Sequence, residues 1–305
     1  MVMQPDLNTR KKKRKQWSLF WLALPFMILI ILLKYVPLGG WIISFFEYRP
    51  GRALMKNKFV GLEYFQILFT DPDILGVLKN TLIFSGISYL LSPLPMLFAI
   101  LLNEIQSSRY RRLAQTITTL PHFISWVIVY ALAFAIFSTE GVLNSVGQLF
   151  DPNFKTIFLT NNDIVYGFQI ALKEWKGLGW SSIIYMAAIS GIDQELYEAA
   201  AIDGAGRFRS TLHITLPGLM PTFIVQLLLS ISNFINTGYD QYYVFKNSVV
   251  FDKIEVLDLY IYRMGMQLGD YSYATAVGMV KSVISIAMLF GANALAKKIR
   301  GNSIV

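Results

Sequence analysis

The 305-residue sequence contains no cysteine and only two histidines. The absence of cysteine excludes disulfide bonds, thiolate metal sites and cysteine nucleophiles. His122 and His213 are far apart and lack metal-ligand spacing, so we interpret both as structural residues. No Gly-Lys dipeptide occurs, which excludes the glycine-rich loop that binds ATP phosphates in P-loop proteins. No Ser-His-Asp or paired-carboxylate pattern is present either, so we expect no catalytic residue, no cofactor and no metal site.

Charged residues are also scarce, at 15% of the chain, whereas soluble domains carry about a quarter. Hydrophobic residues make up 54% and the mean hydropathy is +0.48, so the composition indicates a membrane protein. A net charge of +8 could indicate nucleic-acid binding. The basic residues instead flank apolar runs, which favours a role in membrane topology and no nucleic-acid partner.

A bilayer core needs about 20 residues of helix. Six apolar runs approach that length: 18–33, 81–102, 117–137, 173–192, 216–239 and 271–296. We therefore predict an all-α integral membrane protein with six transmembrane helices. A basic segment, 1–16, precedes this membrane domain at 17–296, and a short tail, 297–305, follows it. The first run is not followed by a small-residue cleavage site, so we interpret it as a span and not as a signal peptide.

Lys and Arg residues in the connections predict the orientation. Fourteen fall on the side that carries both termini and eight on the other, and the richer side has the shorter loops. By the positive-inside rule, both termini of this multi-pass membrane protein are predicted to be cytoplasmic. The connector 191–217 then lies in the cytoplasm, although its acidic residues outnumber its two arginines. Orientation alone does not explain that composition.

The connector 191–217 has the features of a helical hairpin. Asp193 can cap a helix whose first turn carries Glu195, and Gly204 can adopt the positive φ that ends it. A second short helix is expected to end at Pro217. One face of the first helix would carry Leu196, Ala199, Ala200 and Asp203. Such a shallow, acid-bearing helix suits a groove in another protein, and the alternative is a solvated hairpin that only joins two spans.

Several motifs resemble those of type I, binding-protein-dependent ABC importer permeases. Glu198-Ala199-Ala200, Asp203-Gly204-Ala205, Ile214 and Leu216-Pro217 match the "EAA…G…I-x-L-P" cytoplasmic loop of that family. "FVGLEYF" (59–65) and "KNTL" (79–82) resemble the segment before the second span of its sugar-type members. "EWKGLGW" (174–180), "DQYY" (240–243) and "GDYSYATAVGM" (269–279) resemble the branch that handles oligosaccharides and polysaccharide fragments.

This resemblance implies a six-helix permease that imports carbohydrates, with the connector as a coupling helix that docks on a cytoplasmic ATPase. Glu198 would pair with a basic group of the ATPase, Ala199 would permit close approach, and Gly204 would make the turn. Ala200 and Asp203 complete the implied coupling set. The implied partners are a second, different permease chain, two ATPase subunits, an extracytoplasmic solute-binding protein and membrane lipid. ATP hydrolysis is expected in the ATPase subunits and not in this chain.

Polar residues within the predicted spans are candidates for a translocation path. Asn233 and Asn236 are spaced i, i+3 and could line a sugar path or bond across helices. Lys281 could contact substrate, face a water-filled gap or pair with another helix. Trp175 and Lys176 could bind sugar, although aromatic residues near a span end also anchor helices at the membrane interface.

The two longest connections, 38–75 and 240–270, are predicted to lie on the outer face. In the second, a helical stripe could lie on the membrane or pack on the outer mouth of the protein: Ile254, Leu257, Ile261 and Met264. In the first, the segment from Glu47 to Gly51 is a candidate contact for the implied binding protein, or an ordinary structured loop.

Three alternatives remain open at this point. The chain could carry a non-sugar solute within the same importer class. An ion-coupled secondary transporter should show paired carboxylates or an inverted repeat, and Asp and Glu are absent from the predicted spans apart from Glu174. A membrane scaffold or receptor would function without an ATPase partner.

Overall fold

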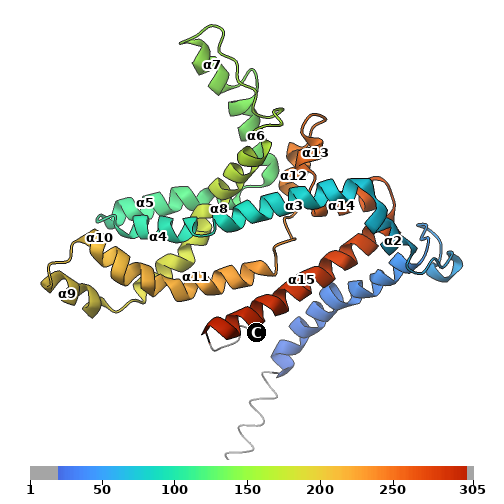
Figure 1. Cartoon of the computed structure of the whole chain (residues 1–305), viewed down its shortest axis with the longest axis horizontal. Helices are drawn as coiled ribbons and strands as arrows, with labels where there is room; N and C mark the ends of the chain where they lie inside the picture. The colour runs from blue at the N-terminus through green and yellow to red at the C-terminus, as the bar shows by residue number, and fades with distance from the viewer. Residues whose placement is uncertain (1–19, 301–305) are drawn as a thin grey trace, which may run out of the picture.

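The structure is a computed structural model that describes residues 20–300, so the predicted segment 1–16 and the end of the predicted tail lie outside the described residues. In the described part the regular elements are helices, apart from one isolated bridge between Phe46 and Phe59. The predicted all-helical fold is thus confirmed there. A first helix, Phe20–Phe45, precedes the labelled helices of Figure 1. These are α2 (Glu63–Thr70), α3 (Pro72–Leu90), α4 (Leu94–Asn103), α5 (Ser108–Thr119), α6 (Trp126–Phe137), α7 (Val142–Gln148), α8 (Val165–Ser190), α9 (Gln194–Ile202), α10 (Arg207–Ser210), α11 (Leu216–Ile231), α12 (Asp240–Phe245), α13 (Phe251–Ile254), α14 (Leu257–Tyr262) and α15 (Tyr271–Arg300).

Among the described residues, five helices are long and apolar enough to cross a membrane: Phe20–Phe45, Pro72–Asn103, Trp126–Gln148, Arg207–Ile231 and Tyr271–Ala294. They correspond to five of the six predicted spans. The remaining prediction falls on α8, a helix of 26 residues. Its length suffices for a bilayer, but Lys173, Glu174 and Lys176 in its middle make it less apolar than the other five.

Several helices begin before the apolar runs that predicted them. Helix α3 begins at Pro72 and not near 81, because Asp71 accepts a hydrogen bond from the Asp73 N–H at 2.9 Å and caps the helix. The predicted third span, 117–137, begins inside α5 and is interrupted by a 3₁₀ turn, Leu120–Phe123, that contains Pro121. These capping and turn residues are polar or proline, so an apolar run alone cannot place the helix starts.

The fifth predicted span, 216–239, is shifted in the structure to Arg207–Ile231. A π-helical stretch, Thr211–Thr215, joins α10 to α11, and Pro217 lies in the first turn of α11. The prediction that Pro217 ends the second hairpin helix is therefore wrong, because proline is tolerated in a first helical turn. At the other end, α11 gives way to an irregular segment in which Gly238 adopts a φ of +76°.

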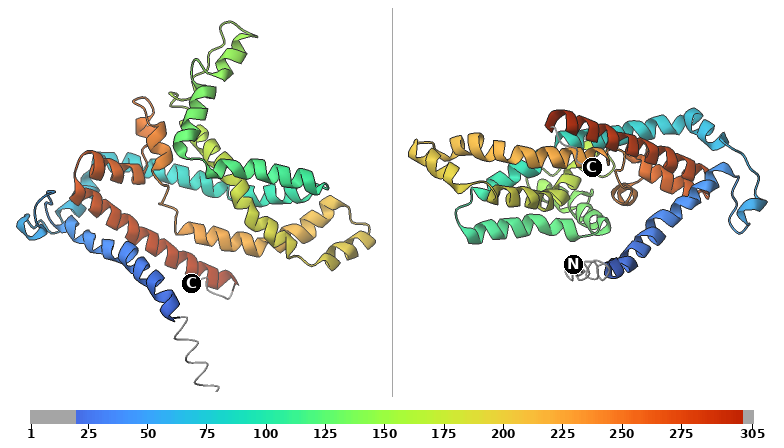
Figure 2. Two further views of the ribbon diagram at one scale, coloured as in Figure 1. Left: turned by 180° about the vertical axis from the view of Figure 1, so that it is seen from behind. Right: turned by 90° about the horizontal axis from the view of Figure 1, so that it is seen from below.

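Helix α8 packs against α4, α5 and α11 and so forms the centre of one half of the molecule (Figure 2). One buried cluster joins α4, α8 and α11: Met96, Ala99, Ile100, Tyr185, Ile189 and Leu219. Gly179 brings α8 close to α5, since a Cβ at that position would lie 2.2 Å from the Thr118 carbonyl oxygen. The residues of α8 are therefore held in fixed positions relative to three other helices.

Helices α12, α13 and α14 pack around the ends of α3, α6 and α15 that lie away from α9 (Figure 1). Ile254 is 0% exposed and Leu257 is 4% exposed. Ile261 and Met264 pack against a buried cluster contributed mainly by α2, α3, α14 and α15. The stripe of apolar residues in 240–270 therefore packs on the protein itself and does not lie on the membrane.

Candidate functional sites

The connector between α8 and α11 forms a hairpin whose first limb, α9, lies as predicted and whose second limb, α10, continues into α11. Asp193 accepts a hydrogen bond from the Glu195 N–H at 3.0 Å and caps α9. Gly204 adopts a φ of +75°, and the next N–H, of Ala205, donates to the Ala200 carbonyl at 2.8 Å. This glycine-centred closure satisfies carbonyl groups that a helix end leaves free. The capping residue and the turn glycine are therefore placed as the sequence predicts.

Two side-chain hydrogen bonds connect the hairpin to the adjoining long helices. The Tyr197 and Thr215 hydroxyl groups are 2.9 Å apart, and the Thr211 hydroxyl donates to the Glu104 carboxylate at 3.2 Å. A cavity of about 550 Å³ lies between α9, the π-helical stretch and the turn after α4. Tyr197 thus connects α9 to the residue before α11, and Thr211 connects the π-helical stretch to the residue after α4.

The predicted coupling residues lie on the accessible side of the hairpin. Glu198, Ala199, Asp203 and Gly204 are exposed, and Ala200 is half-buried. The structure adds two large apolar side chains that the sequence did not assign to the coupling contact: Ile202 is 87% exposed and Phe208 is 82% exposed. Exposed apolar side chains gathered on a small polar hairpin indicate a protein contact. Their position next to the glycine turn is the signal that could have identified them.

Lys281 of α15 forms an ion pair with Asp258 of α14. The Lys281 and Asp258 side chains are only 14% and 16% exposed. The Asp258 carboxylate also accepts a hydrogen bond from the Gly238 N–H at 2.8 Å. Of the roles considered for Lys281, the geometry favours pairing with a neighbouring helix, because a carboxylate of the same chain matches its charge.

Asn233 and Asn236 lie in the irregular segment after α11 and not on a helix, because α11 ends at Ile231. The Nδ2 atom of Asn236 is 3.5 Å from Asn233 Oδ1 and 3.5 Å from Ser285 Oγ. Asn236 and Lys281 line the same cavity, of about 860 Å³. Irregular backbone at membrane depth is tolerated where it lines a cavity or is buried in protein. Asn236 therefore remains a candidate for the translocation path, although it does not lie on a helix.

Trp175 and Lys176 lie in the middle of α8, away from that cavity. Trp175 is 46% exposed, whereas Lys176 is half-buried and donates a hydrogen bond to the His122 carbonyl at 2.7 Å. The His122 ring stacks on Trp180, with ring centres 4.6 Å apart and planes at 3°. The five predicted path residues are therefore split between two places, one beside α8 and one beside α15.

The loop from Glu47 to Gly51 lies at the end of the molecule away from α9. Glu47 and Arg49 form an exposed ion pair at 2.6 Å, and the hydrogen bond from Arg49 lowers the pKa of the Glu47 carboxyl. The Tyr48 N–H donates to the Ser272 hydroxyl at 3.0 Å. The loop is thus exposed at its tip and tied to the first turn of α15.

Residues 91–301 match the family described as "Binding-protein-dependent transport system inner membrane component". Protein LplB of Bacillus subtilis (strain 168) is 40% identical over 288 residues, which cover 94% of this chain and 90% of LplB. The polygalacturonan/rhamnogalacturonan transport system permease protein YteP of the same organism is 38% identical over 298 residues, covering 95% of this chain and 93% of YteP. The crystal structure of a bacterial alginate ABC transporter, in complex with an alginate pentasaccharide-bound periplasmic protein, contains a chain that matches with a TM-score of 0.86 and 32% identity, covering 96% of this chain and 99% of that chain.

The family match includes the hairpin and α8, and the alginate transporter chain covers 96% of this chain. They agree with the motif resemblance in the connector and with the absence of a phosphate-binding loop. This chain belongs to the inner membrane components of binding-protein-dependent transport systems, the permease subunits of ABC importers whose ATP hydrolysis takes place in a separate subunit.

Proposed function

We propose that this permease imports oligosaccharides or polysaccharide fragments. Its relatives include a polygalacturonan/rhamnogalacturonan permease at 38% identity and an arabinooligosaccharide permease at 28% identity. The matching solved transporter binds alginate through its periplasmic protein. Carbohydrate chains are the substrate class common to these three.

In this proposal α8 also crosses the membrane, as the fourth of six spans along the chain, and both termini are cytoplasmic. The 26-residue length of α8 supports its crossing, as does its position between the exposed segment after α7 and the hairpin. The Lys and Arg distribution supports the orientation. The hairpin then faces the cytoplasm, and the loop from Glu47 to Gly51 faces the solute-binding protein outside.

Glu198, Ala199, Ala200, Asp203 and Gly204 would form the contact with the ATPase subunit. The observation that carries this assignment is the exposure of Ile202 and Phe208 on a hairpin whose ends are hydrogen-bonded to α4 and α11. Closure of two ATPase subunits around ATP would draw the hairpins of this chain and of a second, homologous permease together. The long helices would move with them and open the path outward, which is alternating access.

The translocation path would run between the two permeases. Two groups of residues are proposed to line this path or to hold its lining helices in place. They are Trp175 and Lys176 of α8, and Asn233, Asn236 and Lys281 beside α15. Aromatic faces and amide groups are suited to sugar rings and hydroxyl groups. Lys281 would act by holding α14 in place, because its charge is matched by Asp258.

The test is coupling of ATP hydrolysis to uptake in proteoliposomes that contain the whole importer. Gly204→Asp should abolish uptake while membrane insertion is retained, because it puts a charged side chain on the proposed contact at a φ of +75°, which glycine adopts more readily. Glu198→Ala should lower uptake without changing assembly of the two permeases. Gly206→Ala is the matched control, because Gly206 has a φ of −72° and an open surrounding. Normal uptake by Gly204→Asp would contradict the coupling assignment.

A further inference from the structure

One face of α8 carries two lysines and a tryptophan at positions i, i+3 and i+7: Lys173, Lys176 and Trp180. Lys173 Nζ donates to the Ser88 hydroxyl at 3.2 Å. Lys176 Nζ donates to the His122 carbonyl at 2.7 Å and lies 5.5 Å from the centre of the Trp126 ring. Both ammonium groups therefore contact neutral partners.

Among the side chains that the structure describes, the ion pairs involve Arg49, Arg263 (twice) and Lys281, and none includes Lys173 or Lys176. Glu174 is the neighbouring carboxylate, and it follows Lys173 directly on the helix. One negative charge beside two positive charges leaves this part of α8 with an excess positive charge. Lys281 differs, because Asp258 neutralises it within the same chain.

An unmatched charge in the middle of a membrane-length helix is costly unless it faces water or an opposite charge. Lys79 also lies in such a helix, but it is exposed near the beginning of α3, where a lysine side chain can extend to the membrane surface. Lys176 is half-buried and lies about 16 Å from the start of α8 at the helical rise per residue. Its ammonium group has three donors, and the carbonyl of His122 takes one. The other two N–H donors remain available to an acceptor in the proposed translocation path.

The surroundings of Lys176 suit a sugar ring. Trp180 lies one turn further along α8, is 47% exposed, and is held from behind by the stacked His122 ring. Trp180 also lines a mainly apolar cavity of about 680 Å³, whose lining includes Ser92, Ser181, Gln226 and Ser230. Lys176 does not line this cavity, but it is joined to Trp180 through His122, whose carbonyl accepts from Lys176 and whose ring stacks on Trp180.

We infer that this permease selects anionic saccharides, with Lys176 as the residue that binds the carboxylate of an acidic sugar unit and Trp180 as the platform for its ring. Lys173 adds to the positive potential from one turn away. The inference rests on the proposed import of oligosaccharides and adds a charge requirement that lies in the permease itself. The opposite charge is assigned to the substrate because Trp180, which lines the cavity, lies one turn from Lys176 on the same helix.

The experiment compares uptake of galacturonate oligomers with uptake of their methyl-esterified, uncharged counterparts in proteoliposomes containing the whole importer. Every variant uses the same binding protein, so its own preference cancels from the comparison. Lys176→Gln should lower the ratio of acidic to esterified uptake about ten-fold, as loss of a charge-assisted hydrogen bond predicts. Lys176→Arg should retain most of the ratio, and Lys79→Gln, which removes an equal charge from an exposed position, should leave it unchanged.

A second variant tests the same charge without removing a lysine. Ser88→Asp places a carboxylate against Lys173 and should also lower the ratio, even if Lys176→Gln fails to assemble. Equal loss of acidic and esterified uptake in Lys176→Gln, with an unchanged ratio in Ser88→Asp, would overturn the inference and indicate a structural role. Import of neutral oligosaccharides alone by the unaltered protein would also overturn it, while the proposed function would stand. Failure to import any oligosaccharide would instead refute the proposed function.

Discussion

At the scale of single residues, the pair formed by Lys281 and Asp258 explains how a lysine is accommodated in the last long helix. Both side chains are largely buried, and the second oxygen of Asp258 accepts the N–H of Gly238 at 2.8 Å. The pair therefore joins α15 to α14 and to the irregular segment after α11. The two residues are separated by 23 positions and lie on different helices, so the sequence alone could indicate a costly charge but not its partner.

We predict that Asp258→Asn destabilises the protein by about 3–5 kcal/mol, because removing one member of a buried pair leaves an uncompensated charge. The double variant Asp258→Asn/Lys281→Met should recover most of this loss, since it removes both charges and keeps an acceptor for Gly238. Thermal unfolding of the purified protein in detergent measures both effects. Equal destabilisation in the single and double variants would show that the charge pairing contributes little.

At the scale of helices, local signals were sufficient for the hairpin but not for the long spans. Asp193 and Gly204 act on backbone groups within a few residues, so their roles can be predicted from sequence. The segment 232–237 is more polar than α11, and its contacts are tertiary, since the Phe234 carbonyl accepts from Ser85 and Asn236 lies against Ser285. The close approach of α8 and α5 at Gly179 is likewise a tertiary contact. Asn233 and Asn236 were therefore predicted as candidates but placed on a helix wrongly.

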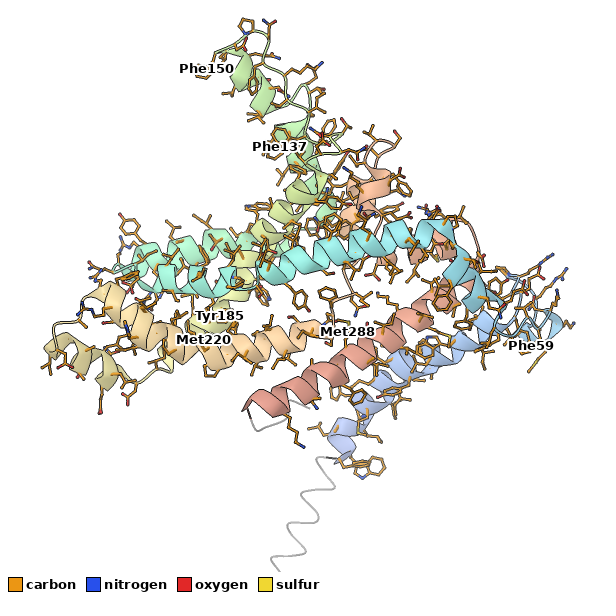
Figure 3. All side chains as sticks on the ribbon, in the orientation of Figure 1. Phe59, Phe137, Phe150, Tyr185, Met220 and Met288 are labelled. Carbon is orange, nitrogen blue, oxygen red and sulfur yellow. The ribbon has the colours of Figure 1, made fainter. Side chains whose placement is uncertain are left out.

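The hairpin also gives a prediction that does not depend on any charged residue. Phe208→Ser should weaken association with the ATPase subunit by about 1–3 kcal/mol, the contribution of one buried aromatic side chain at an interface. Phe150→Ser is the matched control, because Phe150 is 86% exposed and lies at the far tip of the segment after α7 (Figure 3). Co-purification of the ATPase at graded detergent and salt concentrations measures the difference. Equal retention of the ATPase by both variants would exclude Phe208 from the contact.

At the scale of the whole molecule, composition and periodicity indicate an all-helical membrane protein, and the family match agrees. The crossing by α8 is the part that composition obscures, because Lys173, Glu174 and Lys176 reduce its apolar character. In a transporter these charges are acceptable where a helix faces a path or a partner chain instead of lipid. A helix can thus span the bilayer without the uniform apolar sequence that identifies its neighbours.

The absence of cysteine makes this crossing directly testable, since any introduced cysteine is the only thiol in the chain. Phe150→Cys and Ile202→Cys place thiols at positions 86% and 87% exposed, and α8 is the one long helix between them. A membrane-impermeant maleimide should label Phe150→Cys in intact cells and Ile202→Cys only in inside-out vesicles of cells that lack the ATPase subunit, which would otherwise cover Ile202. Labelling of both from the same side would mean that α8 does not cross, and labelling of Ile202→Cys from outside would place the hairpin where no cytoplasmic ATPase can reach it.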